Sequence, residues 1–172
     1  KTDRSISTVS NTYGEQFNEV DKDSKKLLPE MEKNEFRFLI LSAYYEHKNL
    51  EILNQIIPLI QKGGNTNIKY ITTLPNVTFA KVFSDEAQKN ILNVGPIKPD
   101  DCPPLYVETQ AIFLPTLLEC FSATYAEAMK MKSPIITTNL GFAKSICGNA
   151  ALYYDPIDAQ DAYNNIMELI EN

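Results

Sequence analysis

The sequence is poor in the side chains that most metal centres and activated nucleophiles need. His47 is the only histidine, and the three cysteines, Cys102, Cys120 and Cys147, show no C-x-x-C spacing. One histidine argues against most zinc sites and against a Ser-His-Asp or Cys-His nucleophile. An odd number of cysteines suits a reducing compartment better than a disulfide framework. We therefore expect buried thiols, no metal ligands and no cofactor.

Glycine, positive charge and long apolar runs are also scarce. The chain has six glycines among 172 residues and contains neither G-x-G-x-x-G nor G-x-x-x-x-G-K-[ST], which argues against an ordinary nicotinamide dehydrogenase or a P-loop enzyme. The net charge of −6 at pH 7 provides no broad surface for nucleic acid or for an anionic membrane. No run predicts a membrane span or a signal peptide. We expect a soluble, cytoplasmic domain that holds any anionic ligand locally.

The apolar pattern predicts an α/β fold. Residues 1–34 are polar, with one short strand candidate at 6–9, so we interpret them as a leading linker and not as core. Strands are predicted at 36–43, 67–74, 91–97, 111–115, 134–138 and 151–155, and helices at 49–62, 79–90, 100–109, 124–132, 142–148 and 159–172. Strands that are apolar on both faces predict a Rossmann-like, three-layer α/β/α domain with a mostly parallel sheet of about six strands. Pro58 should kink the first helix or end its regular part near Ile57.

The stretch "PTLLECFSATYAEAMKMKSPIITTN", residues 115–139, is the strongest candidate for a binding site. In parallel sheets, ligands bind at loops that lead from strand ends into helices. If a helix begins near Thr124, the free amides of Ser122, Ala123 and Thr124 favour an anion such as a diphosphate, and Glu127 could accept hydroxyl hydrogens from a sugar or ribose. The spacing from Thr124 to Glu127 is equally that of a capping box, in which Glu127 bonds only the N-cap amide. The local sequence leaves both interpretations open.

Two more charged residues belong to the predicted strand ends. Glu119 follows an apolar strand and faces either the crevice or solvent. Lys48 precedes a predicted helix, where it is either a surface lysine or a partner for phosphate oxygens in the same crevice. Tyr44 and Tyr45 add hydroxyls beside Lys48, although adjacent tyrosines are more often one packed and one exposed.

Three blocks, in order, resemble one known family. They read "NVGPIKPDDCPPLY", "AIFLPTLLECFSATYAEAMKMKSPIITTN" and "ICGNAALYYDPID". From Phe36 onward the chain resembles the C-terminal, donor-binding half of GT-B glycosyltransferases of group 1, and Glu119 and Glu127 match the E-x7-E motif of that family. The resemblance implies transfer of a sugar from a nucleotide-diphosphate donor, with retention at the anomeric carbon and no obligatory metal. It suggests cell-surface polysaccharide or lipopolysaccharide synthesis as the pathway.

The resemblance also implies how the chain is organised. Residues 1–34 would be a leading segment from the interdomain region, and residues 35–172 the donor-binding domain. The chain then resembles a fragment whose partner is the N-terminal acceptor domain of the full-length protein, and alone it should bind nucleotide weakly without transferring sugar. Any peripheral membrane attachment is expected in that other half, and neither membrane insertion nor nucleic acid is expected here.

Roles carried over from the family fall on named residues of this chain. Glu119 would contact the donor sugar and Lys48 would steady the diphosphate as it leaves, so these two are the predicted catalytic residues. Glu127 would bind the ribose. The remaining predicted donor-binding residues are Phe121, Ser122, Ala123, Thr124, Tyr44, Tyr45 and, beside the base, Gly95.

The chain departs from the family pattern in three places. Ser42-Ala43 stands where most relatives have G-[RK], so the usual arginine partner of the lysine is missing and Tyr44 or Tyr45 could replace it only partly. Ser122 stands where a glycine is common, and "TTLPN" replaces a frequent G-x-G. Two other functions fit the same fold: a non-enzymatic doubly wound module and one half of a nucleotide-sugar epimerase. The single histidine weighs against the epimerase.

Overall fold

The computed structural model describes residues 12–19, 26–120 and 122–171 of the chain. Its centre is one sheet of six parallel strands in the order β3-β2-β1-β4-β5-β6. The strands are β1 (Phe36–Ile40), β2 (Ile68–Thr72), β3 (Ile91–Asn93), β4 (Ala111–Leu114), β5 (Ile135–Thr138) and β6 (Ala151–Tyr154). This order is that of a doubly wound Rossmann-like domain. The predicted fold class is confirmed.

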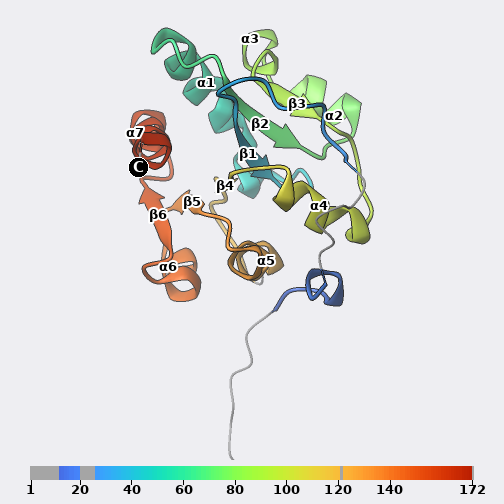
Figure 1. Cartoon of the computed structure of the whole chain (residues 1–172). Coiled ribbons are helices and arrows are strands. Elements are labelled where there is room, and N and C mark those ends of the chain that lie inside the picture. The colour runs from blue at the N-terminus through green and yellow to red at the C-terminus, as the bar shows by residue number, and fades with distance from the viewer. Residues whose placement is uncertain (1–11, 20–25, 121, 172) are drawn as a thin grey trace, which may run out of the picture.

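Helices cover both faces of the sheet (Figure 1). They are α1 (Leu53–Lys62), α2 (Asn76–Val82), α3 (Asp85–Gln88), α4 (Cys102–Val107), α5 (Ala123–Met131), α6 (Gly141–Cys147) and α7 (Ala159–Glu171), with short 3-10 helices η1 (Glu15–Phe17), η2 (Glu46–Lys48), η3 (Leu50–Ile52) and η4 (Pro99–Asp101). Side chains alternate along each strand, so Phe38 of β1 packs in a core with α1, α2, α3 and α7, whereas its neighbour Leu39 packs in a second core with α4, α5 and α6.

The single helix predicted at 79–90 is wrong, because the chain forms two helices there. Phe83 adopts extended backbone angles, φ −108° and ψ 134°, which ends α2. Ser84 then caps α3, and its hydroxyl accepts a hydrogen bond from the Ala87 amide at 3.2 Å. Asn54 of α1 also accepts a bond from the Ser84 amide at 2.9 Å. The break therefore seats α3 against α1.

We expect the Ser84→Ala variant to lose about 1 kcal/mol of unfolding free energy, the usual cost of removing a serine N-cap. Urea unfolding measures it, and Ser145→Ala is a fitting control, because the Ser145 hydroxyl bonds only the Phe142 carbonyl within its own helix. Equal stabilities of the two variants would contradict a capping role for Ser84.

The prediction that the regular part of the first helix could end near Ile57 is also wrong. Helix α1 continues through Pro58 to Lys62. Pro58 is the sixth residue of α1, so the missing amide hydrogen affects only one bond near the start of the helix, to Asn54. Ile56, Ile57 and Ile60 are fully buried on either side of it, and their packing holds the helix.

The described part of the leading segment packs on the domain, contrary to its interpretation as a linker outside the core. Phe17 and Leu28 are buried in the second core, 1% and 5% exposed. The carboxylate of Glu108 accepts the backbone amides of Leu27 and Leu28 at 2.7 and 2.9 Å. The strand candidate at 6–9 lies outside the described residues.

Candidate functional site

The candidate site lies between β1 and β4, where the strand order reverses. The loops that follow these two strands are joined by hydrogen bonds to the carbonyl oxygen of His47, from the Leu117 amide at 2.7 Å and from the Thr116 hydroxyl at 3.2 Å. Doubly wound sheets bind ligands in the crevice at this reversal, beyond the carboxyl ends of the strands. The fold thus brings the regions of Lys48 and Glu119 together from distant parts of the sequence.

Lys48 and Glu119 form an ion pair in this crevice. The Lys48 Nζ lies 2.5 Å from Glu119 Oε1, and the two side chains are 20% and 10% exposed. Glu119 therefore faces the crevice and not solvent, and Lys48 is not a free surface lysine. Ser42, Ser122 and Thr124 line the same small cavity as this ion pair, and its free volume is only about 10 Å³.

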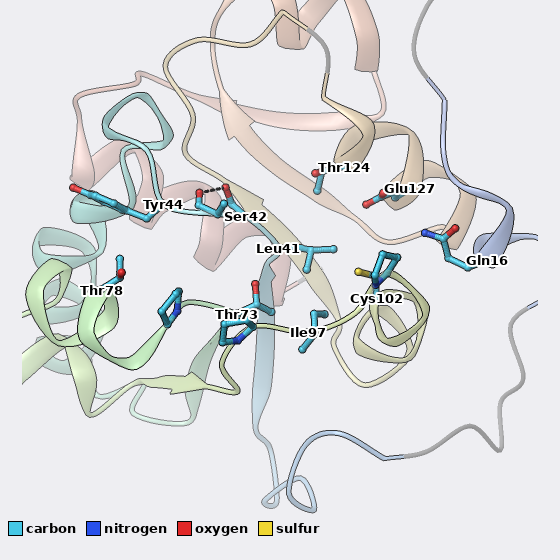
Figure 2. Close-up of a pocket in the computed structure, with 14 residues that line it drawn as sticks. Gln16, Leu41, Ser42, Tyr44, Thr73, Thr78, Ile97, Cys102, Thr124 and Glu127 are labelled. Carbon is cyan, nitrogen blue, oxygen red and sulfur yellow. Dashed lines mark hydrogen bonds between the residues drawn. The ribbon is translucent and has the colours of Figure 1, made fainter.

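A larger pocket of about 680 Å³ adjoins this cavity (Figure 2). Ser42 and Thr124 line both spaces. The loops after β1, β2 and β3 supply most of the wall, and α5 contributes Thr124 and Glu127. Among the described residues that line this pocket, Glu127 carries the only formal charge. An anionic ligand would therefore place its charge near Lys48 and the start of α5, not in the large pocket.

Glu127 is not part of a capping box. Helix α5 begins at Ala123 after the N-cap Ser122, which makes no side-chain capping bond, so Glu127 lies a full turn inside the helix. Its Oε2 instead accepts a hydrogen bond from the Tyr106 hydroxyl at 3.1 Å. Burial raises the pKa of Glu127, and the bond from Tyr106 opposes that rise. The capping interpretation is wrong because the helix starts earlier than the sequence pattern indicates.

The other predicted residues occupy different surroundings. Tyr44 lines the large pocket, and its hydroxyl donates to Glu51, which raises the pKa of Tyr44. Tyr45 is 58% exposed, stacks on His47 and lines neither cavity. Ala123 is the first residue of α5, and Phe121 lies outside the described residues. Gly95 has φ +77°, and the residues after it, Pro96 and Ile97, line the pocket.

Sequence reasoning missed three residues of this site. Gln16 reaches the pocket from η1, and Cys102 and Tyr106 come from α4. In Figure 2, Cys102 and Glu127 lie at one end of the pocket and Tyr44 and Thr78 at the other. Burial and the carboxylate of Glu127 raise the pKa of Cys102 to about 11, so its thiol stays protonated at neutral pH and is a poor nucleophile.

The sequence model of one family, described as glycosyl transferases group 1, matches residues 35–172. The chain belongs to the group 1 glycosyl transferases. The resemblance predicted from the E-x7-E motif and its flanking blocks is thereby confirmed. No curated protein matches the chain.

Three solved structures share the fold of this group 1 domain. Sucrose-phosphate synthase from Thermosynechococcus elongatus matches with a TM-score of 0.63 and 17% identity over 80% of this chain and 37% of that one. The UDP-forming alpha,alpha-trehalose-phosphate synthase from Burkholderia vietnamiensis matches with a TM-score of 0.65 and 10% identity, over 78% of this chain and 37% of that one. A variant of S. aureus TarM was solved in complex with fondaparinux, alpha-GlcNAc-glycerol and UDP. It matches with a TM-score of 0.67 and 18% identity, over 84% of this chain and 30% of that one.

The chain spans about a third of the length of these proteins. It has the Rossmann-like architecture of one half of a GT-B glycosyltransferase. Across the described ranges, no helix combines the length and apolarity needed to cross a bilayer. The part of the chain with assigned positions also contains no cluster of three or more His, Cys, Asp or Glu side chains suited to a metal ion.

Proposed function

We propose that this domain binds a nucleotide-diphosphate sugar in the crevice between β1 and β4 and holds it for glycosyl transfer with retention. One observation carries the proposal. Glu119, the start of α5 and Glu127 line two cavities that meet at Ser42 and Thr124. A ligand with a sugar, a diphosphate and a ribose in that order would present each group to a matching partner along this path.

The diphosphate would lie between Lys48 and the start of α5. The first amides of a helix have no partner within it, and together with the helix dipole they favour an anion. Ser122 and Thr124 line the cavity beside the Lys48 ammonium. As the bond from the sugar to the diphosphate breaks, negative charge grows on the leaving phosphate oxygen, and these fixed donors stabilise it.

The two carboxylates would bind the polyols on either side of the diphosphate. Glu119 would accept hydroxyl hydrogens of the sugar, and Glu127 those of the ribose, because a carboxylate is a strong acceptor for paired hydroxyls. The base would then lie against the uncharged part of the large pocket, which includes Pro96 and Ile97. UDP in the TarM complex makes UDP the first nucleotide to test.

The acceptor would be bound by a second domain. Because the chain spans about a third of its structural neighbours, we propose that the acceptor is bound by an N-terminal domain of the full-length protein, in the cytoplasm. Retention at the anomeric carbon and a role in cell-surface polysaccharide assembly follow from the family resemblance of the E-x7-E segment. Alone, the 172-residue chain is expected to bind nucleotide without transferring sugar.

Thermal unfolding in the presence of UDP, GDP or ADP tests the proposal. A ligand that binds only the folded state stabilises it by about 2.7 kcal/mol at 100 times its dissociation constant, so one nucleotide should raise the melting temperature in a saturable way. The Glu127→Gln variant should bind that nucleotide about tenfold more weakly, the loss expected for hydrogen bonds to a charged group.

A matched control is Glu86→Gln, which removes an exposed carboxylate outside both cavities and should leave the nucleotide affinity unchanged. If none of the three nucleotides shifts the melting temperature, or if Glu127→Gln binds as the unmodified chain does, the donor-binding proposal fails. A non-enzymatic module would then be the better interpretation.

A further inference from the structure

The carboxylate of Glu127 is held by a residue from another helix. Tyr106 belongs to α4 and lies 21 positions before Glu127, yet its hydroxyl donates to Glu127 Oε2 at 3.1 Å. The side chain of Tyr106 is only 3% exposed. The Thr124 carbonyl oxygen lies farther away, at 3.5 Å from the same hydroxyl. A tyrosine hydroxyl has one hydrogen to donate, and a carboxylate is the stronger acceptor.

We propose that Tyr106 is a positioning residue for Glu127: it fixes one carboxylate oxygen and so presents the other to the hydroxyls of the bound nucleotide. This inference rests on the donor-binding function proposed above and names a residue that completes that site. A carboxylate on a flexible stem must be ordered before it can bind two hydroxyls, and the ordering costs free energy at each binding event. A bond already present in the empty domain removes part of that cost.

The ring of Tyr106 is itself held in place by the leading segment. Phe17 of η1 meets it edge to face, with ring centroids 5.6 Å apart and an interplanar angle of 81°. Both rings lie in the core that also buries α4 and α5. Edge-to-face pairs are a preferred aromatic geometry, and tight packing restricts the rotamers of both side chains. The hydroxyl therefore has little freedom to leave Glu127.

The same bond favours the ionised form of Glu127. Among the described residues, the titratable groups that interact with Glu127 include the Tyr106 hydroxyl and the Cys102 thiol, both on α4. Burial raises the pKa of both groups, so both are uncharged at neutral pH and neither supplies a counter-charge. Burial raises the pKa of Glu127 as well, and the Tyr106 hydrogen bond acts against that rise. Removing the hydroxyl should therefore raise the pKa of Glu127 further.

Replacing Tyr106 with phenylalanine removes the hydroxyl and keeps the ring against Phe17. At pH 7, Tyr106→Phe should weaken binding of UDP, or of whichever of GDP and ADP binds the unmodified chain, by about tenfold. Affinity should fall as the pH drops through the pKa of Glu127, because the protonated carboxyl accepts fewer hydroxyl hydrogens. In the variant this fall should begin at a higher pH than in the unmodified chain.

Tyr125→Phe is the matched control. Tyr125 is a fully buried tyrosine of the same core, and its hydroxyl bonds Thr137 at 2.8 Å and not Glu127. It should cost stability as Tyr106→Phe does, but leave both the affinity and its pH profile unchanged. A purely structural role for Tyr106 predicts that the two variants behave alike.

The double variant Tyr106→Phe with Glu127→Ala separates this inference from the function on which it rests. If Tyr106 acts through Glu127, its removal should change affinity less than about twofold once alanine has removed the acceptor of its hydrogen bond. Nucleotide binding that Tyr106→Phe leaves intact, or weakens equally in both backgrounds, overturns the inference while the donor site stands. Absence of nucleotide binding to the unmodified chain overturns the proposed function and the inference together.

Discussion

Replacing Lys48 with methionine should weaken binding of a nucleoside diphosphate by about 100-fold, the usual cost of truncating one partner of a shielded charge pair. Lys48 is the only lysine or arginine among the described residues that line the two cavities. In the proposed donor site, Lys48 would therefore supply most of the charge that balances the diphosphate. Isothermal titration with UDP, GDP and ADP measures the loss.

The same variant should also be less stable in the absence of ligand. Without Lys48, the carboxylate of Glu119 would remain only 10% exposed and would lose its cationic partner. An unpaired, largely buried carboxylate costs about 1 to 3 kcal/mol of unfolding free energy. Methionine keeps the length and most of the volume of the lysine stem, so the loss reports charge and not packing.

Two comparisons make the result interpretable. Lys89 forms an ion pair with Glu86 at a similar 2.5 Å, but the two side chains are 65% and 51% exposed, so Lys89→Met should change neither binding nor stability measurably. Glu119→Gln keeps the shape of the crevice and weakens the hold on Lys48. To bind Lys48, a diphosphate must compete with the carboxylate of Glu119. The Glu119→Gln variant should therefore bind a sugar-free nucleotide more tightly. Weaker binding by Glu119→Gln would contradict that exchange.

The sequence predicts the sheet well because its strands are buried on both faces. The run 111–114 is apolar without alternation, and 36–40 departs from that pattern only at Arg37, which is itself buried; continuous apolar runs of this kind are typical of central parallel strands. The break at Phe83 was missed because the apolar period continues across it, although Ser84 followed by acidic residues was a readable capping signal. The helix propensity of a sequence predicts where helices form more accurately than it predicts where they end.

The sequence predicted where the residues of the candidate site lie, but not which side chains interact with one another. Strand ends of a parallel sheet gather at one edge, so Lys48 and Glu119 could be assigned to one crevice from the sequence. That they pair with each other, across 71 residues, depends on side-chain geometry that no local pattern encodes. Tyr106 was missed for the same reason, because its contact with Glu127 joins two helices of the finished core.

Removing the Phe17 ring should strongly destabilise the domain. Phe17→Ala should cost about 3 to 5 kcal/mol of unfolding free energy, the range for truncating a buried phenylalanine. Phe17 is 1% exposed and contacts the ring of Tyr106 across the second core. Small domains are stable by only about 5 to 15 kcal/mol, so this loss would remove a large share of the total. Urea unfolding monitored by tyrosine fluorescence measures it.

The comparison with a neighbour of Phe17 decides whether the leading segment is part of the domain. Tyr13 lies on the same segment, but it is only partly buried, and its ring contacts the Lys130 ammonium 4.9 Å from its centroid. Tyr13→Ala should therefore cost about 1 kcal/mol or less. If Phe17→Ala were as mild as Tyr13→Ala, the segment would not be docked in solution, and Tyr106 would lack the support that we assign to it. A large loss of unfolding free energy in Phe17→Ala, together with weaker nucleotide binding at pH 7, would support the opposite conclusion. The leading segment would then help to position the carboxylate of Glu127 through the packed rings of Phe17 and Tyr106.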